Sequence, residues 1–377
     1  MGLSDDLAAV VGVDWVLTGV LERHLYGKDA GVSRGDPAAV VLPADTAQTA
    51  ACVRIARRHG MSIVARGAGT GLAGGAVPDG ALVIALTRLN RIFDVDAASR
   101  TARVGPGVIN LDLSRHTEPL GLHYAPDPSS QPACTIGGNV ATNAGGPHCL
   151  ADGTTVAHIL GIELVTADGE IVELGGAAPD PLGLDLRAAI VGSEGTLGIV
   201  TGVTVRLMDN SPAVKTLLFG FARIEDAAAT VSGVIAAGVV PAAMEVMDRP
   251  MVEAVENFAH AGYPVDAAAV LLAEVAGHPA GVAAEADLIE RTGRRHDATS
   301  VRIAANDDER ALLWKGRKAA FGAVAQAAPD YYLHDTVVPR TKLVEVLSGV
   351  YEIAARHDLL MMNVFHAGDG NLHPLVA

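Results

Sequence analysis

The chain has 377 residues, half of them hydrophobic and 19% charged, which is the composition of a globular protein too long for one ordinary core. Its formal net charge of −15 opposes binding to nucleic acid and to anionic membrane surfaces, but permits a small anionic substrate held by a local cationic pocket. Three cysteines without a Cys-x-x-Cys pair argue against a disulfide framework, and Asp5 and Asp6 stand where a signal peptide needs positive charge, so we predict a soluble cytoplasmic protein.

The first half of the chain alternates apolar runs with glycine-rich segments, which predicts strands and helices joined by tight loops. Asp45 or Thr46 is placed to cap a helix that ends at Gly60. The expected elements are a helical then irregular segment at 1–36, strands at 37–43, 62–65 and 81–86, a β-rich stretch to 104, a hairpin at 156–173 and a strand ending the glycine cluster at 192–200.

Ser211 and Pro212 mark the expected boundary between two domains. The uncharged run 227–244 is rich in Ala and contains Gly and Pro, so we interpret it as a packed helix followed by a strand and not as a membrane span. Beyond this boundary the expected strands and helices alternate, which is typical of an α+β or an α/β domain. The expected elements are strands at 216–221, 241–247, 269–275 and 373–377, with helices from 225, 250 and 280.

The segment from Arg66 to Gly75 is not a dinucleotide fingerprint of the G-x-G-x-x-G type, because Leu72 occupies the third glycine position. The segment also leads into a strand, whereas that fingerprint opens a helix. Five glycines in ten residues allow successive N–H groups to form an anion-binding concavity, although an ordinary loop has the same composition. Further clusters at 127–146 and 192–198 favour a large dinucleotide with a flat ring.

These segments together resemble the FAD-linked oxidases of the vanillyl-alcohol oxidase type, and among them the glycolate oxidase FAD subunits and bacterial D-lactate dehydrogenases. The resemblance covers nearly the whole chain. It is carried by 66–75, by D-P-S-S at 127–130, by G-G-N-x-x-x-N-A-G-G at 137–146, by G-S-E-G-T-L-G at 192–198, and by Tyr26 and Asp29 in an early Y-x-x-D element. It implies an N-terminal segment (1–36), a PCMH-type FAD-binding domain of two α+β subdomains (37–211) and an α+β cap domain with an antiparallel sheet (212–377).

The resemblance implies noncovalent FAD, because covalent relatives tether the ring through a His and none lies in 66–75. A lone His148 is predicted to be structural. The expected cofactor-binding residues are Arg66, Gly67, Ala68, Gly69, Thr70, Gly71, Gly74, Gly75, Asp127, Ser129, Ser130, Gly137, Gly138, Asn139, Asn143, Gly192, Glu194, Gly195, Gly198 and Ile199.

A cationic cluster at 314–318 is either a solvated helix face or a carboxylate clamp built on the planar fork of Arg317. Similar proteins grip the substrate carboxylate with an Arg at this position, so the resemblance favours the clamp. The D-x-x-V-P segment from Asp335 to Pro339 is interpreted as mainly structural, with Lys342 a weaker candidate for substrate contact.

The string H-A-G-D-G-N-L-H places His366 and His373 on either side of a glycine-containing turn. Two such histidines are either core residues or ligands of one centre. The string is typical of the 2-hydroxy-acid dehydrogenases of the family, which implies that both histidines lie at the active site and ligate a divalent metal, Zn or Mn. With Arg317 they form the expected catalytic set for a D-2-hydroxy acid, which loses its hydroxyl proton to a base and hydride to the flavin.

The family resemblance breaks off at the C-terminus. Relatives continue to a G-E-H-G segment that supplies a metal-ligating Glu and a His base, whereas this chain ends at Ala377 and contains no Glu-His pair. We therefore expect a truncated cap domain with an incomplete active site; the alternative is a noncatalytic FAD-binding subunit or an inactive fragment of a larger redox complex, and a NAD-dependent enzyme ranks third. The expected partners are the hydroxy acid, an electron-acceptor protein or a quinone, and a second copy in a homodimer, with any iron–sulfur cluster on another chain.

Overall fold

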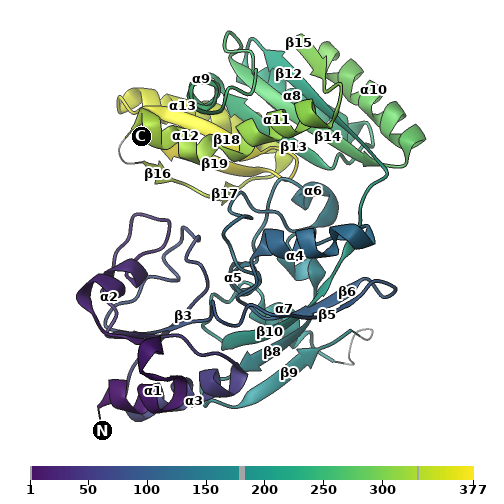
Figure 1. The fold of residues 1–377 in the computed structure, drawn as a ribbon. Coiled ribbons are helices and arrows are strands. Elements are labelled where there is room, and N and C mark those ends of the chain that lie inside the picture. Colours follow the sequence, from purple (N-terminus) through teal and green to yellow (C-terminus); the bar gives the residue numbers. More distant parts are fainter. Residues whose placement is uncertain (1, 178–182, 329–330) are drawn as a thin grey trace. The chain divides into compact units, whose positions relative to one another are not determined.

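The computed structural model describes residues 2–177, 183–328 and 331–377 and divides the chain into two units (Figure 1). Unit 1 holds the residues up to Gly146 and Gly153–Asn210, and unit 2 holds Pro147–Asp152 and Ser211–Ala377. The chain thus enters unit 2 for six residues, returns to unit 1 and leaves it finally at Ser211, an excursion that the sequence did not lead us to expect.

Unit 1 begins with helices and continues with three sheets, all counted within the described residues. Its helices and 3₁₀ turns are α1 (Leu3–Val11), η1 (Val13–Trp15), α2 (Val20–Tyr26), α3 (Thr46–Arg58), α4 (Asn110–Thr117), η2 (Glu118–Leu120), α5 (Ile136–Thr142), η3 (Thr155–His158) and α7 (Leu186–Ile190). Its strands are β1 (Val16–Leu17), β2 (Ala39–Val41), β3 (Ile63–Arg66), β4 (Leu82–Ala85), β5 (Ile92–Asp96), β6 (Thr101–Val104), β7 (Leu122–His123), β8 (Ile159–Val165), β9 (Ile171–Gly175), β10 (Ile199–Arg206) and β11 (Met208–Asp209).

The first sheet of unit 1 has the order β1-β2-β4-β3, in which β4 pairs in parallel with both β2 and β3. Helix α3 crosses between β2 and β3, and it begins where the Asp45 carboxylate accepts the amide of Gln48 at 2.7 Å. The apolar face of α3 packs on this sheet, and Val165 and Ile199 of the second sheet join the same core. The loop after β3 therefore has a fixed base.

The second sheet of unit 1 has the order β5-β6-β10-β8-β9, and all of its pairs are antiparallel. Gly169 lies in the turn of the β8–β9 hairpin, at a φ of 79° that favours glycine. Helices α4 and α5 contribute Leu113, Ile136 and Val140 to the core on this sheet. The end of β3, the start of β10 and the start of α5 line one pocket, described below.

Unit 2 is built on one antiparallel sheet with the order β15-β12-β14-β13-β18-β19-β16, with β17 also paired to β19. Its strands are β12 (Ala213–Phe221), β13 (Ala243–Asp248), β14 (Ala269–Gly277), β15 (Ala298–Ile303), β16 (Tyr332–Leu333), β17 (Thr336–Val337), β18 (Met361–His366) and β19 (Asn371–Val376). Its helices are α6 (Cys149–Asp152), α8 (Ile224–Ala236), α9 (Arg249–Ala259), α10 (Pro279–Arg295), α11 (Asp307–Lys318), α12 (Ala320–Ala327), the 3₁₀ turn η4 (Arg340–Lys342) and α13 (Leu343–Arg356).

Helices cover both faces of this sheet (Figure 1). Alternate residues of each central strand enter two separate cores, as the two-residue period of a strand requires. Val246 and Leu271 pack under α8, α10 and α13, whereas Met247 and Leu272 pack under α9, α11 and α12. The second face also carries two buried carboxylates, Glu245 and Glu274.

The α+β fold class expected from the sequence is confirmed, with an antiparallel sheet in unit 2 where the sequence left an α/β arrangement open. The uncharged run forms α8 and β13, as expected. Within the described residues, no helix is both long and apolar enough to span a bilayer.

Candidate functional site

The first glycine-rich segment, 66–75, is held in place by the N-terminal segment of the chain. The buried Asp29 carboxylate accepts the amides of Gly31 at 2.8 Å and Gly74 at 2.9 Å. The amide of Ala30 donates to the carbonyl of Gly71 at 3.0 Å. The loop therefore has a defined backbone path, and Asp29 of the early Y-x-x-D element holds it.

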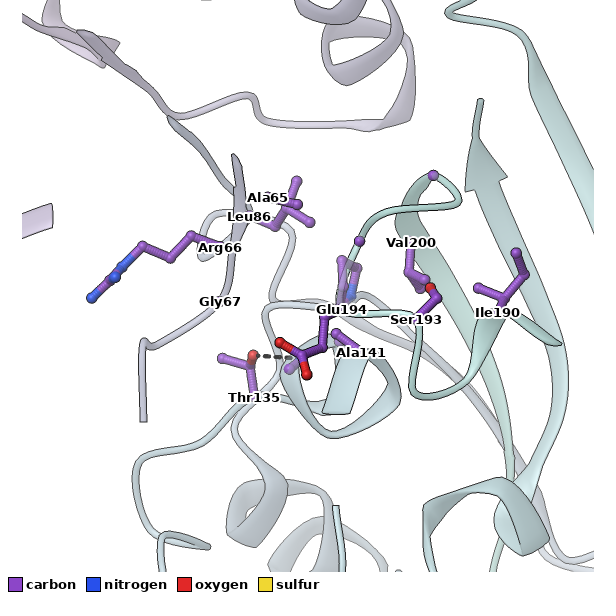
Figure 2. Close-up of a pocket in the computed structure, with 15 residues that line it drawn as sticks. Ala65, Arg66, Gly67, Leu86, Thr135, Ala141, Ile190, Ser193, Glu194 and Val200 are labelled. Carbon is purple, nitrogen blue, oxygen red and sulfur yellow. Dashed lines mark hydrogen bonds between the residues drawn. The ribbon is translucent and has the colours of Figure 1, made fainter. Parts of the chain in front are cut away.

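Arg66 fixes the same loop with its charge. Its guanidinium donates to the carbonyls of Lys28 at 2.8 Å and Ala76 at 3.2 Å, and lies 5.5 Å from the centre of the Tyr26 ring. Figure 2 shows this side chain extending away from Ser193 and Glu194. The positive charge of Arg66 is thus committed to the N-terminal segment.

The start of α5 approaches the end of β3 through glycines. Thr135 caps α5, its hydroxyl accepting the amide of Gly138 at 3.2 Å. A Cβ at Gly67 would overlap the same Thr135 hydroxyl, and a Cβ at Gly137 would overlap Pro106. Only glycine allows the two backbones to come this close.

The third glycine segment, 192–198, is strongly curved. Gly192, Glu194, Gly195 and Gly198 all have positive φ, at 84°, 52°, 77° and 147°. The amides of Gly192 and Glu194 donate to carbonyls of α5 at 2.9 Å and 2.8 Å. Because this backbone conformation is unfavourable for Glu194, the loop is held by the structure around it.

These segments enclose a pocket of about 480 Å³, counting the space at its open mouth. Figure 2 shows it between Ala65 and Gly67, the α5 cap Thr135 and the α5 residue Ala141, and the segment that runs from Ile190 to Val200. Seven expected cofactor residues line it: Arg66, Gly67, Gly137, Gly138, Glu194, Gly195 and Gly198. The sequence analysis missed eight others: Ala65, Leu86, Pro106, Thr135, Ala141, Ile190, Ser193 and Val200.

The other expected cofactor residues lie outside this lining and support it or flank it. The Asn139 amide oxygen accepts from Asn110 at 2.8 Å, and the Asn143 amide oxygen accepts the amide of Val156 at 2.9 Å. The residues outside the lining are Ala68, Gly69, Thr70, Gly71, Gly74, Gly75, Asp127, Ser129, Ser130, Asn139, Asn143, Gly192 and Ile199.

The pocket fits a flat cofactor that carries polar groups, on two observations. Its walls are small residues and exposed backbone, over which a ring system can lie. The buried Ser193 hydroxyl also has no hydrogen-bond partner within the described residues, and a bound polar group would satisfy it. This agrees with the FAD site expected for unit 1.

Two of the substrate-side residues expected in unit 2, Arg317 and His366, meet at one carboxylate. Arg317 of α11 and Glu245 of β13 both have 0% of their surface exposed. Glu245 Oε2 lies 2.7 Å from Arg317 Nε and 2.6 Å from Nη2. Arg317 is therefore not on a solvated helix face, and the sequence analysis missed its partner, a lone charge in an apolar strand.

The two histidines of the H-A-G-D-G-N-L-H string lie side by side on β18 and β19. Their ring centres are 5.1 Å apart and the rings are nearly perpendicular. His366 Nδ1 lies 2.7 Å from Glu245 Oε1, across a strand pair that places these two residues opposite each other. Burial and the neighbouring His366 lower the pKa of His373 to about 4, so this imidazole is neutral near pH 7.

Burial opposes the ionisation of Glu245, but the charges of Arg317 and His366 outweigh it and hold the pKa of Glu245 below its ordinary value. By contrast, burial raises the pKa of Asp369. Asp335 lies closer to the histidines than its structural interpretation implied, with Oδ1 3.7 Å from His373 Nδ1 and 2.8 Å from the Asn371 amide nitrogen.

The expected metal site is not supported. No group of three or more His, Cys, Asp or Glu residues in the described ranges is arranged to hold a metal ion. His366 Nδ1 is engaged by Glu245, and two imidazoles fall below the three protein ligands usual for a catalytic metal. The two histidines are therefore considered below without a metal.

A second buried carboxylate, Glu274 of β14, holds the same helix α11 further along. It accepts from Thr216 and from Trp314 Nε1 at 2.5 Å each, and from Arg310 Nε at 3.0 Å. His148 of the six-residue excursion lies 3.5 Å away through Nε2. These donors outweigh burial and lower the pKa of Glu274 to about 2.

Comparison with known proteins agrees with the two units. The sequence model of an FAD binding domain matches residues 37–175, and that of the C-terminal domain of FAD linked oxidases matches residues 211–377. The glycolate oxidase subunit GlcD of Escherichia coli strain K12 is 46% identical over 344 residues, which cover 91% of this chain and 69% of that protein. GlcD of Bacillus subtilis strain 168 is 42% identical, covering 93% and 76%.

The D-lactate dehydrogenase of Anaerostipes hadrus is 32% identical over 363 residues, covering 93% of this chain and 74% of that protein. Among solved structures, p-cresol methylhydroxylase with bound substrate superposes with a TM-score of 0.85 at 16% identity, covering 99% of this chain and 81% of that one. At that identity the likeness concerns the fold alone.

Proposed function

Because this chain belongs to the family of FAD-linked oxidases, we propose that this oxidoreductase converts a small D-2-hydroxy acid, glycolate or D-lactate, into the 2-oxo acid. FAD, when bound, accepts the hydride that leaves C2 of the substrate. The relatives known as glycolate oxidase subunits and D-lactate dehydrogenases support this choice of substrate class. A further protein or a quinone then takes up the electrons.

The observation that carries the proposal is the state of Arg317. Its guanidinium is buried, and Nη1 has no hydrogen-bond partner within the described part of the chain, whereas Nη2 lies 2.6 Å from Glu245 Oε2. An unsatisfied buried donor costs free energy, and a carboxylate is a strong acceptor for a guanidinium. Since Arg317 has no exposed surface, a substrate carboxylate reaches it only when neighbouring side chains move.

The hydroxyl of the substrate needs a proton acceptor, and the two histidines supply candidates. A neutral His373 both accepts and donates hydrogen bonds, and its Nδ1 has no hydrogen-bond partner within the described residues. His366 has its Nδ1 directed to Glu245, which leaves Nε2 for the substrate. We assign the hydroxyl contact to this pair and the carboxylate contact to Arg317.

The test is dye reduction by the FAD-loaded protein with glycolate and D-lactate, with L-lactate and the methyl ester of D-lactate as controls. We expect turnover with the free D-hydroxy acids and little with the ester, which lacks the carboxylate. A protein that binds FAD and turns over none of these acids would instead be the noncatalytic FAD-binding subunit.

A further inference from the structure

Glu245 is shared between the two chemical groups of the site. One oxygen, Oε2, accepts from Arg317 Nε at 2.7 Å, and the other, Oε1, lies 2.7 Å from His366 Nδ1. Strand pairing places Glu245 directly opposite His366, and α11 supplies Arg317 from above the same face of the sheet. A single carboxylate with no exposed surface therefore contacts both partners at once.

We propose that Glu245 is a positioning residue with two roles: it is the internal counter-ion of Arg317 while no substrate is bound, and it holds the ring of His366 in one orientation through Nδ1. This inference rests on the proposed oxidation of a 2-hydroxy acid. Beyond that reaction, the inference concerns a residue, Glu245, that in these roles touches neither the substrate nor the flavin.

The counter-ion role follows from burial. An isolated buried guanidinium is strongly unfavourable, so Arg317 requires a negative charge whenever the site is empty. A substrate carboxylate brings a second negative charge to the same guanidinium and is repelled by Glu245. Glu245 therefore weakens the binding of carboxylates, substrate and product alike, and helps the 2-oxo acid to leave.

The orienting role follows from the hydrogen bond to His366. A carboxylate only accepts, so the Nδ1 that faces Oε1 must carry the hydrogen. This hydrogen bond fixes the orientation of the His366 ring and leaves Nε2 for other contacts.

Glu274 provides a matched control on the next strand. It is also buried, also paired with an Arg of α11, and packed on the same face of the sheet. Its partners Thr216, Trp314 and Arg310 are on other elements than the two histidines. A purely structural carboxylate in this region is therefore expected to behave like Glu274.

The experiment compares Glu245→Gln with Glu274→Gln in FAD-loaded protein, using oxalate as a nonreacting carboxylate and glycolate or D-lactate as substrate. Glu245→Gln should bind oxalate about tenfold more tightly than the wild type, because oxalate supplies the missing counter-charge. For the same reason, oxalate should raise the melting temperature of Glu245→Gln more than that of the wild type. In the same variant kcat should fall about 100-fold with no rise in KM, since His366 loses its orienting partner. Glu274→Gln should show the wild-type affinity for oxalate.

Two more variants keep the test decisive if Glu245→Gln does not fold. Glu245→Asp keeps the charge but is one methylene shorter, so it should retain tight folding, show wild-type oxalate affinity and lose part of kcat. The double variant Glu245→Gln/Arg317→Met removes both charges. It should have a higher melting temperature than Glu245→Gln, and oxalate should not raise that temperature.

Unchanged or weaker oxalate binding in Glu245→Gln, or equal behaviour of the Glu245 and Glu274 variants, would overturn the inference. The proposed function fails separately, if the wild-type protein oxidises no 2-hydroxy acid. If the wild type turns over a 2-hydroxy acid but Glu245→Gln binds oxalate no more tightly than the wild type, only the proposed role of Glu245 is rejected and the proposed function stands.

Discussion

Two buried carboxylates on neighbouring strands hold the same helix of unit 2, and they differ in what they leave unsatisfied. Glu274 accepts from Thr216, Trp314 and Arg310, and it completes its set with His148. Glu245 binds Arg317 and His366, yet Nη1 of Arg317 still lacks a hydrogen-bond partner among the described residues.

This difference distinguishes the surroundings of Glu274, which stabilise the fold, from the surroundings of Glu245, which can bind a ligand. A buried charge whose donors are all engaged fixes α11 on the sheet and has nothing to offer a ligand. Around Glu245, by contrast, the partners keep a donor and an imidazole nitrogen that are unpaired within the described residues. A small acid bound there would satisfy these groups. Substitutions at the two carboxylates and at their partners test this distinction.

Arg317 and Arg310 lie seven residues apart on α11 and allow the most direct contrast. Arg317→Met should lower kcat/KM for glycolate or D-lactate by about 100-fold, the upper range for one lost charge-assisted pair. Arg310→Met should change it less than about threefold, because Glu274 keeps its other donors. Steady-state dye reduction measures both, with FAD content checked for each variant. Equal losses in the two variants would remove the distinction.

Glu274 should contribute to stability with a defined pH dependence. Its pKa in the folded protein, about 2, is below the ordinary value of 4.5, so its contribution is complete above pH 4.5 and is lost as the pH falls toward 2. The size is about 3 kcal/mol. Glu274→Gln should therefore lower the stability of unit 2 most at neutral pH, and the difference from the wild type should shrink between pH 5 and pH 3.

Urea unfolding followed by Trp314 fluorescence in a Trp15→Phe background reports on unit 2 for this comparison. A difference between Glu274→Gln and the wild type that does not change with pH would contradict the assignment of a depressed pKa.

Asp248, at the end of β13, should show the opposite sign. It accepts from Tyr351, from the Asn363 amide and from the Met251 amide, with no cation among its hydrogen-bond partners in the described ranges, and burial raises its pKa to about 6. Ionisation then opposes folding, so stability should fall by up to about 3 kcal/mol as the pH rises from about 4 to 6, and stay level above. Asp248→Asn should lack this fall. The same urea unfolding assay at pH 4.5 and pH 7 measures this change in stability for the wild type and for Asp248→Asn. If Asp248→Asn shows the same fall in stability as the wild type, the raised pKa is contradicted.

His148 offers the smallest effect. Its ring lies 5.6 Å from the Trp314 ring and 3.5 Å from Glu274, so His148→Ala should lower the stability of unit 2 by about 1 kcal/mol. Oxalate affinity should remain that of the wild type. A large loss of oxalate binding would place His148, and the excursion that carries it, within the carboxylate site.

The pocket of unit 1 was predictable from the sequence in part, because its glycine segments depend on local backbone conformation and seven of the expected residues line it. Glycine segments such as 192–198 encode their turns directly, and the structure brings three of them around one pocket. The apolar lining residues such as Leu86 and Ile190 were missed, since nothing local distinguishes them from core residues.

The substrate side was predictable only in part. Arg317 and the two histidines were identified through their motifs, but Glu245 lies 72 and 121 residues away from Arg317 and His366. Only strand pairing and helix packing bring these residues together. The expectations of a homodimer, a cytoplasmic location and a particular electron acceptor stay predictions.

The most direct test of the account is the anaerobic reaction of the FAD-loaded protein with a 2-hydroxy acid, followed by flavin absorbance. The account predicts that D-lactate or glycolate bleaches the bound flavin in the wild type, and that Arg317→Met and Glu245→Gln bleach at least about 10-fold more slowly. Glu274→Gln should bleach within about threefold of the wild-type rate. A bound flavin that no 2-hydroxy acid reduces, while a chemical reductant bleaches it fully, would contradict the account.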